Sequence, residues 1–406
     1  MSVLPAQALF AAQNLEDPSR LWALLRELGP VSRIEGTRAF WVVSPDAIED
    51  VLARHADFSA NLTGVLLRQA DGQVGTFPIE GAGGNAIATA DEPEHAVQRR
   101  LLMPPLKASR VLGLESEIRD FAREKVAALL RAGGGDWCNA VAEVVPAFVV
   151  ARLLGLGDET LDTVRRWAMM GGDMLGGLID LPGMHRLSTE NAAMHAFLSG
   201  HLQAMLSRAA DQRGDSLTAT LAGGVESGAI AFGQGVGILV VLFGAAGEST
   251  AALMGMALRL MLRTPGMQEQ LRREPGALEA FVEETIRLES PFKFHYRVVR
   301  CDTTLAGTAL AAGDRLLLGW AAANRDPARF GDPDAVRLDR PNPQRHLGFG
   351  HGIHFCIGAP LARMEVRVVL GELLAQTQWI EEPPEGSHVL PNIFVRRMER
   401  LGIRCR

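Results

Sequence analysis

Apolar residues recur every three to four positions along most of this chain, which is the spacing of one face of an α-helix. The pattern predicts helices over Glu115–Arg131, Val141–Leu154, Thr160–Met170, Glu190–Ala209, Gly237–Arg263, Ala277–Leu288 and Ala359–Leu374. Strand patterns are short and few, and they fall at Val31–Ile34, Phe40–Val43, Tyr296–Arg300, Arg315–Leu318 and within Val389–Ile403. The first two strands form a predicted hairpin. We therefore expect a mainly α protein with a minor β part.

One central segment, Ala229–Gly247, is apolar enough to span a bilayer, with Gln234 as its only polar side chain. Five of its residues are glycines, and Glu248-Ser249-Thr250 continue it without a basic flank. We interpret it as a helix buried on all sides in the middle of the core, and not as a membrane span.

Two segments rich in glycine show little regular pattern, Asn61–Asp91, which includes Gly81-Ala82-Gly83-Gly84, and Gly171–Gly183. Long loops inside a compact domain are often lids or binding loops. Simple surface loops without a function are an equally good interpretation.

Composition narrows the class of protein. The 406 residues contain no linker, repeat or low-complexity tract, so we predict one domain over 1–406. A formal net charge of -6 and a single tyrosine, Tyr296, argue against nucleic acid as a partner. The four cysteines are far apart and Met1–Arg20 has no pattern of a signal peptide or anchor, which predicts a cytoplasmic protein with free thiols and no membrane.

The most informative of these cysteines is Cys356, which lies in a glycine-rich loop directly before the last predicted helix. Glycines let the backbone fold tightly around the sulfur and let a flat group approach it. Backbone N–H groups and the helix N-terminus can stabilise a thiolate there, which suits an iron ligand. Two alternatives remain from the residues alone: an inert buried thiol, and a zinc site with His346, His351 and His354.

The spacing Phe-x-x-Gly-x-x-x-Cys-x-Gly at Phe349, Gly352, Cys356 and Gly358 resembles the haem-binding loop of the cytochrome P450 family. The resemblance implies a P450 fold with haem b between a long central helix and the helix after the cysteine loop. Cys356 would then be the iron ligand, and Phe349, Gly350 and Gly358 would contact the haem.

Other segments resemble the same family in the expected order. Glu284 and Arg287 match its Glu-x-x-Arg, with Arg340 available as a third partner, and the resemblance implies a buried structural network. His95 and Arg99 lie one helical turn apart, so they can reach one anion, although such pairs are also common on helix surfaces. The resemblance implies that they bind haem propionates together with Arg297 and His354.

The segment Ala245–Thr250 places an acid and alcohols within the apolar central helix. In the family, small residues here leave room for dioxygen, and an acid–alcohol pair guides protons to it. The resemblance assigns this catalytic role to Glu248 and Ser249, although threonine is usual where Ser249 stands and glycine where Ala246 stands. Thr250 is the alternative alcohol, and a purely structural role in capping or bending the helix is a third interpretation.

The resemblance implies a monooxygenase that uses O2 to hydroxylate or epoxidise an apolar small molecule. No flavin, nicotinamide or iron–sulfur motif is present, so electrons would come from a ferredoxin-type donor with its reductase. We expect a monomer in which Arg363 and Arg367 attract that donor, unless they form ordinary salt bridges. Phe292, Phe294 and the Met169–Met184 region predict an apolar pocket. Oxidative coupling in a biosynthetic pathway and a non-catalytic haem sensor or carrier are the alternative functions.

Overall fold

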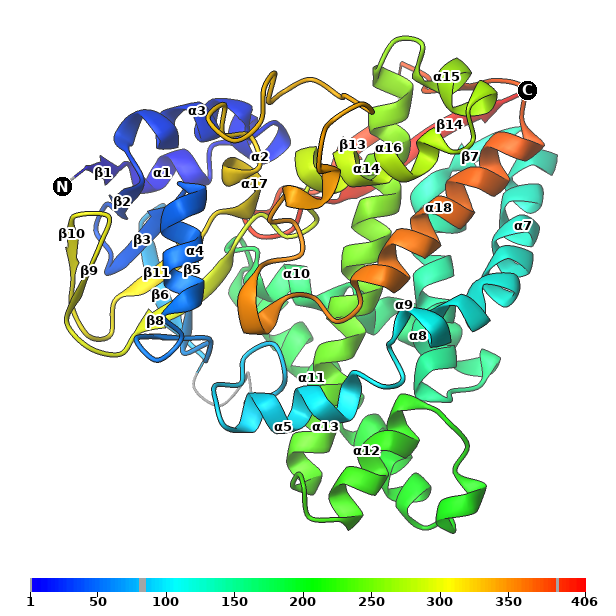
Figure 1. The fold of residues 1–406 in the computed structure, drawn as a ribbon, viewed down its shortest axis with the longest axis horizontal. Coiled ribbons are helices and arrows are strands. Elements are labelled where there is room, and N and C mark those ends of the chain that lie inside the picture. Colours follow the sequence, from blue (N-terminus) through cyan, green and yellow to red (C-terminus); the bar gives the residue numbers. More distant parts are fainter. Residues whose placement is uncertain (1, 80–84, 385–386) are drawn as a thin grey trace.

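The computed structural model describes residues 2–79, 85–384 and 387–406. Long helices fill one side of the molecule, and the N-terminal helices and most strands form the other (Figure 1). The mainly α architecture with a minor β part is confirmed. The four residues Gly81-Ala82-Gly83-Gly84 lie outside the described residues.

The helices are, in chain order, α1 (Ala6–Leu9), α2 (Ala12–Glu16), α3 (Ser19–Leu28), α4 (Pro45–Ala53), α5 (Glu94–Leu102), α6 (Ala108–Val111), α7 (Glu115–Arg131), α8 (Val144–Leu154), α9 (Leu161–Ala168), α10 (Met170–Leu175), α11 (Leu181–Leu206), α12 (Leu217–Glu226), α13 (Phe232–Leu242), α14 (Ser249–Arg263), α15 (Met267–Arg273), α16 (Ala277–Leu288), α17 (Trp320–Ala323) and α18 (Ala359–Gln376). Two π-helical turns, Cys138–Ala142 and Phe243–Glu248, precede α8 and join α13 to α14. The bounds predicted for α7 and α16 are the observed ones.

The strands are β1 (Val3–Leu4), β2 (Val31–Ile34), β3 (Ala39–Val42), β4 (Phe58–Ser59), β5 (Gly64–Arg68), β6 (Val74–Pro78), β7 (Gly134–Asp136), β8 (His295–Val299), β9 (Thr303–Leu305), β10 (Thr308–Leu310), β11 (Arg315–Leu318), β12 (Ile380–Glu381), β13 (Ser387–Val389) and β14 (Met398–Cys405). The largest sheet has the order β1-β2-β3-β11-β8-β4. β2 and β3 form the predicted antiparallel hairpin, and β11 joins it by pairing in parallel with β3.

Two segments are more regular than their sequence indicates. Asn61–Asp91 contains the hairpin β5–β6, and Gly171–Gly183 contains most of α10 and the start of α11. The Asp180 side chain accepts a hydrogen bond from the Gly183 N–H at 2.7 Å, and Pro182 occupies the first turn. This cap starts α11 nine residues before the predicted helix at Glu190, where local pattern alone is weak.

The helix Phe232–Arg263, formed by α13, the π-helical turn and α14, runs through the middle of the molecule (Figure 1). Among the described residues it is the one helix long and apolar enough to cross a membrane by length and composition. Of its most apolar 18-residue window, 56% is buried inside the protein, which agrees with a core helix. α14 packs against α18 and α16, and α18 also packs along α7. This arrangement brings the segment before α18 close to the central helix.

Candidate functional site

A cavity lies between the central helix and the segment 348–358 that leads into α18. Its atom-free space is about 1350 Å³, including the part open to solvent. The central helix supplies its apolar wall, and α5, β8 and the cysteine loop supply polar groups. The lining includes all but one of the residues predicted to bind the cofactor or act in catalysis: His95, Arg99, Ser249, Arg297, Phe349, Gly350, His354, Cys356 and Gly358.

The cysteine loop is shaped by local backbone geometry. Gly350 and Gly352 have φ values of +70° and +71°, which residues with a side chain rarely adopt. The Cys356 N–H donates to the Phe349 carbonyl at 3.0 Å, so the loop closes on itself. Burial raises the pKa of the Cys356 thiol, although the Gly358 N–H and the charge of Arg363 oppose this. A bound cation would favour the thiolate strongly in this setting.

The zinc interpretation finds no support in this geometry. His346 lies away from the sulfur and contacts the Glu283 carboxylate at 2.9 Å, while His351 is exposed. Within residues 2–79, 85–384 and 387–406, no three or more His, Cys, Asp or Glu side chains are placed to hold a metal ion. Cys356 therefore lacks, among the described residues, the set of three or four protein ligands that zinc sites need.

Cationic and donor groups from three separate segments meet on one side of the cavity. The His95 Nδ1 contacts Glu92 Oε1 at 3.1 Å, but its buried Nε2 has no hydrogen-bond partner among the described residues. Arg297 is buried and donates to its neighbour's carbonyl, that of Tyr296, at 2.7 Å. The His95 and His354 rings lie 4.1 Å apart between centroids.

The charges and hydrogen-bond donors of these side chains are only partly balanced by other groups of the protein. Burial lowers the pKa of Arg297 to about 10, and burial together with Arg297 and His95 lowers the pKa of His354 to about 3. Arg99 donates to the Phe355 carbonyl at 2.9 Å, and no carboxylate pairs with Arg99 or Arg297 among the described residues. A flat cofactor that carries two carboxylates would satisfy this set, so these residues fit haem.

The central helix faces the cavity with small and apolar side chains. Ala245, Ala246, Ser249 and Thr250 all contribute to the lining. They lie in or directly after the π-helical turn, and such turns occur often at functional sites. The Ser249 hydroxyl donates to the Ala245 carbonyl at 2.5 Å, as alcohols in helices commonly do. The structure thus exposes both candidate alcohols to the cavity.

Glu248 is the predicted site residue that is absent from the cavity lining. Its side chain is 1% exposed, accepts from the Gly172 N–H at 2.6 Å and lies 3.6 Å from Arg397 Nε. Burial raises its pKa to about 8, even though Arg397 and the Gly172 N–H lower it. The carboxyl therefore retains a proton near neutral pH, but it faces away from Ser249's side of the helix.

Sequence reasoning missed two titratable residues of the cavity. Glu365 on α18 is 2% exposed, its Oε2 has no hydrogen-bond partner among the described residues, and burial raises its pKa well above the usual range. His295 accepts from Trp320 Nε1 at 2.8 Å, and burial lowers its pKa to about 3. The signal for Glu365 was a carboxylate among apolar residues on a buried face of the last helix, since Leu361, Val368 and Val369 are its neighbours there.

The predicted pocket residues are only partly correct. Phe292 lines the cavity, but Phe294 packs in the core against Trp41 at 5.0 Å between ring centroids. No described residue of the Met169–Met184 region lines the cavity either. The apolar wall comes instead from Ile87, Val241, Leu242 and Leu253.

Two predicted docking arginines are engaged within the protein. Arg363 pairs with Glu283 at 2.5 Å, and Arg367 pairs with Glu115 at 2.8 Å. The alternative interpretation, ordinary salt bridging, is the one that the structure shows. The expectation that they attract an electron donor by free positive charge is therefore wrong.

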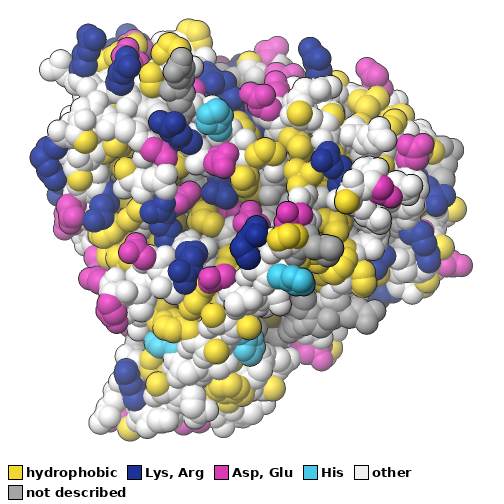
Figure 2. Space-filling view, turned by 180° about the vertical axis from the view of Figure 1, so that it is seen from behind, with side chains coloured by type: hydrophobic (Ala, Val, Ile, Leu, Met, Phe, Trp, Pro, Cys, Tyr) yellow, Lys and Arg dark blue, Asp and Glu magenta, His cyan; other side chains and the backbone are white. Residues whose placement is uncertain are grey.

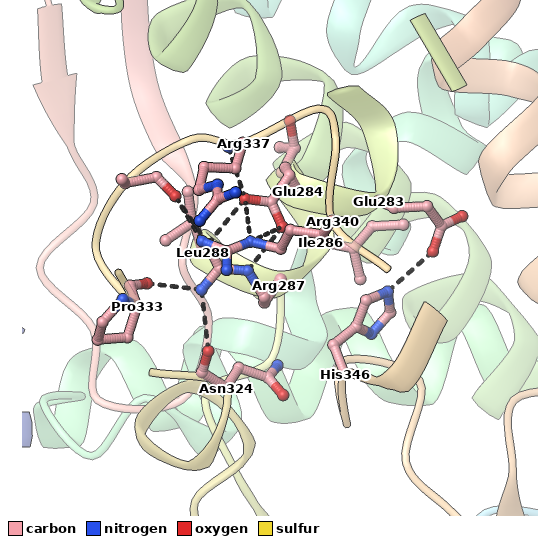
Figure 3. Close-up of polar contacts among 12 residues, drawn as sticks. Glu283, Glu284, Ile286, Arg287, Leu288, Asn324, Pro333, Arg337, Arg340 and His346 are labelled. Carbon is pink, nitrogen blue, oxygen red and sulfur yellow. Dashed lines mark hydrogen bonds and ion pairs between the residues drawn. The ribbon is translucent and has the colours of Figure 1, made fainter. Parts of the chain in front are cut away.

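The predicted network behind the cysteine loop is confirmed (Figure 3). Glu284 accepts from Arg287 Nε at 2.7 Å and Nη2 at 2.8 Å, and from Arg340 Nε at 2.9 Å. Arg287 also donates to the carbonyls of Asn324, at 3.1 Å, and Pro333, at 2.6 Å. Since the Asn324 side chain accepts from the Leu347 N–H at 2.6 Å, the network reaches the start of the loop.

Comparison with known proteins gives a consistent result. A family model described as Cytochrome P450 matches residues 235–395. Cytochrome P450 144 of Mycobacterium tuberculosis is 40% identical over 400 residues, which cover 98% of this chain and 91% of that protein. Cytochrome P450 109 of Bacillus spizizenii is 28% identical over 409 residues, covering 99% and 95%.

Solved structures agree with these relatives. The structure of CYP109E1 from Bacillus megaterium in complex with testosterone has a TM-score of 0.84 at 25% identity, over 97% of this chain and 98% of that one. CYP108D1 from Novosphingobium aromaticivorans has a TM-score of 0.85 at 25% identity, over 100% of both chains.

Proposed function

Because the chain belongs to the cytochrome P450 family of haem-thiolate monooxygenases, whose cofactor is haem b, we propose that it hydroxylates or epoxidises an apolar small molecule. The observation that carries the substrate class is the cavity wall formed by the central helix, which consists of aliphatic side chains apart from Ser249 and Thr250. A pocket lined in this way gains free energy by removing apolar substrate surface from water.

We assign the haem contacts residue by residue. Cys356 is the proposed iron ligand, and Phe349, Gly350 and Gly358 lie beside it in the same cavity lining. His95, through its unpartnered Nε2, and Arg99, Arg297 and His354 would hold the two propionate carboxylates. When bound, haem b supplies the iron at which dioxygen is activated, and thiolate ligation favours cleavage of the O–O bond.

Ser249 and Glu248 are the proposed proton-handling residues. The Ser249 hydroxyl lines the cavity and can present a proton there once it leaves the Ala245 carbonyl. Glu248 lies next to it in sequence and holds a proton near neutral pH, since burial raises its pKa to about 8. A rotation of Glu248 away from the Gly172 N–H is needed before it can pass that proton toward Ser249.

The proposed electron donor is a ferredoxin-type protein with its reductase. Phe355, next to Cys356, is 40% exposed, and Met103 at the end of α5 is 37% exposed. Arg100 and Lys107 are exposed nearby on the same part of the chain. An apolar patch with flanking positive charge suits an acidic redox protein, and it replaces Arg363 and Arg367 as the docking surface that we propose.

We further propose a cytoplasmic monomer, since charges of both signs are mixed over the face shown in Figure 2.

A spectroscopic experiment tests the haem assignment. The reduced holoprotein with carbon monoxide should give the red-shifted Soret band of a thiolate-ligated haem. C356A should lose that band, whereas C405A, which removes a half-buried cysteine of β14, should keep it. A C356A protein that retains the band refutes the assignment of the ligand.

A second experiment tests the substrate class. CYP109E1 was crystallised with testosterone, so steroids are suitable first ligands for a screen by haem spin-state shift. Turnover of a hit with a surrogate ferredoxin and reductase should yield a product with one added oxygen atom. A product coupled without added oxygen indicates oxidative coupling, and a holoprotein that consumes no electrons with any hit indicates a sensor or carrier.

A further inference from the structure

A second large cavity lies away from the haem site, between the start of α3, the end of α14 and the segment after α16. We call it the rear cavity. Its atom-free space is about 1420 Å³, including the part open to solvent, and it shares no lining residue with the haem cavity. Six of its lining side chains are cationic, Arg20, Arg259, Arg263, Lys293, Arg325 and Arg396, and four are acidic, Glu16, Asp17, Glu289 and Asp334.

Three of the four acidic side chains of the rear cavity pair with other residues of the same lining. Glu289 pairs with Arg396 at 2.9 Å, and Asp334 pairs with Arg325 at 2.7 Å. Asp17 accepts hydrogen bonds from the backbone and side chain of Ser19 at 3.0 and 2.7 Å. These contacts leave little negative charge for the remaining cations.

Arg259 is a cation without a partner in this cavity. It makes no hydrogen bond or ion pair with any residue that the structure describes, and its Nε is buried. Burial, followed by the positive charges of Arg263 and Arg396, lowers its pKa. Arg259 is half-buried, and the attraction of the more distant Glu289 and Glu382 carboxylates offsets only part of the hydration that its guanidinium loses.

Lys293 is a second lining cation without an ion pair. Its side chain is buried, with 3% of the residue exposed, and its Nζ donates to the carbonyl of Asn392, with no carboxylate partner among the described residues. Burial and then Arg396 lower its pKa to about 7. A lysine at such a buried position is unfavourable unless an anion binds beside its ammonium group.

We propose that the rear cavity is a binding site for a doubly charged oxyanion of the phosphate class, free or as a monoester. The planar guanidinium of Arg259 presents paired N–H donors that match the oxygens of such an anion, and Lys293 supplies a compact charge. Arg263 pairs with Glu382 outside the lining, so Arg20, Arg259 and Lys293 are the lining cations without an ion pair among the described residues. An anion of charge two would pair with Arg259 and Lys293. The cavity is wide enough for the ester group as well as the anion.

The experiment is calorimetric titration of the haem-loaded protein at low ionic strength with inorganic phosphate, inorganic sulfate and phenyl phosphate. We expect one saturable site per chain. R259Q should weaken binding of inorganic phosphate at least tenfold, and K293M, which keeps a linear side chain, should weaken it as well. R131Q removes an exposed arginine at the end of α7 and should bind as the unchanged protein does.

The results of this titration distinguish a site for phosphate monoesters, a site for the free anion, and no site. Binding of phenyl phosphate as tightly as inorganic phosphate identifies a site for monoesters, and binding of the inorganic ions alone identifies a site for the free anion. Absence of saturation with all three probes overturns the proposal. So does an R259Q variant that binds inorganic phosphate as tightly as the unchanged protein. A loss of binding in R131Q as large as that in R259Q also overturns it, because the effect would then be one of net charge and not of the site. Melting curves and the haem spectrum of R259Q and K293M establish that each variant is folded.

Discussion

The network around Glu284 offers the sharpest test of the physical reasoning. The substitution Glu284→Gln keeps the shape of the side chain and removes its charge. Glu284 is 1% exposed, Arg287 is fully buried, and the side chain of Arg340 is 6% exposed. Both guanidiniums would then keep their charge at a position where solvent cannot replace the lost carboxylate (Figure 3).

The expected cost follows from this burial. Breaking a buried ion pair by removing one partner typically costs about 3–5 kcal/mol, because an uncompensated charge stays behind. Arg287 retains its bonds to the carbonyls of Asn324 and Pro333, which limits the loss. We therefore expect Glu284→Gln to lower the free energy of unfolding by about 3 kcal/mol or more. Because the network also supports the start of the cysteine loop, haem should be released earlier during unfolding.

The chain provides a matched control. Glu382 also accepts two hydrogen bonds from one arginine, Arg263, at 3.0 and 3.1 Å, but the side chain of that arginine is 53% exposed. Solvent screens this pair, so Glu382→Gln should cost about 0–1 kcal/mol. Urea unfolding of the holoprotein, followed by circular dichroism and by the Soret band, measures both variants. If the two substitutions cost the same within 1 kcal/mol, burial is not what makes the Glu284 network important.

Three further predictions concern the region around Glu248. G172A should destabilise the protein by about 1–3 kcal/mol in thermal melts, because its Cβ would lie 2.4 Å from Glu248 Oε1, whereas G200A, which meets open space, should not. Since burial raises the folded pKa of Glu248 to about 8, the folded state binds more protons than the unfolded state between about pH 4.5 and 8, so stability should fall as pH rises through that window. E248Q should flatten this part of a plot of melting temperature against pH, and an unchanged slope would show that Glu248 does not titrate there. S249A should raise peroxide release per electron consumed, and unchanged coupling would assign proton handling to Thr250 or to water.

Helices were predictable from the sequence where one segment carries a complete helical pattern. Ala277–Leu288 has helical spacing throughout, and it places Glu284 and Arg287 on one face. The hairpin β5–β6 was not predictable in the same way. Its strands are stabilised by contacts with distant groups, such as the hydrogen bond from the Leu66 N–H to the Tyr296 hydroxyl at 3.1 Å. Local sequence does not contain that information.

For the site, the sequence predicted which residues take part better than it predicted where their side chains point. The spacing around Cys356 identified its loop, and the structure brings His95, Arg297 and His354 to the same cavity. Side-chain direction is what the sequence leaves open. Glu248 and Ser249 are adjacent in the chain, but the π-helical turn before them and the Gly172 N–H direct the carboxyl away from the cavity. Phe294 likewise packs in the core against Trp41, although Phe292 two positions earlier lines the cavity.

The parallel pairing of β3 with β11 has a consequence for how the chain is made. Ala39–Val42 is entirely buried, yet its partner Arg315–Leu318 is synthesised 276 positions later. At about 5–20 residues per second, the ribosome needs roughly 14–55 s to deliver that strand. During this time β1, β2 and β3 lack the strand that covers the edge of β3, and so small a sheet is only marginally stable. The newborn N-terminal segment therefore exposes an apolar strand edge until most of the protein exists, which makes it a natural client for chaperones that bind during translation.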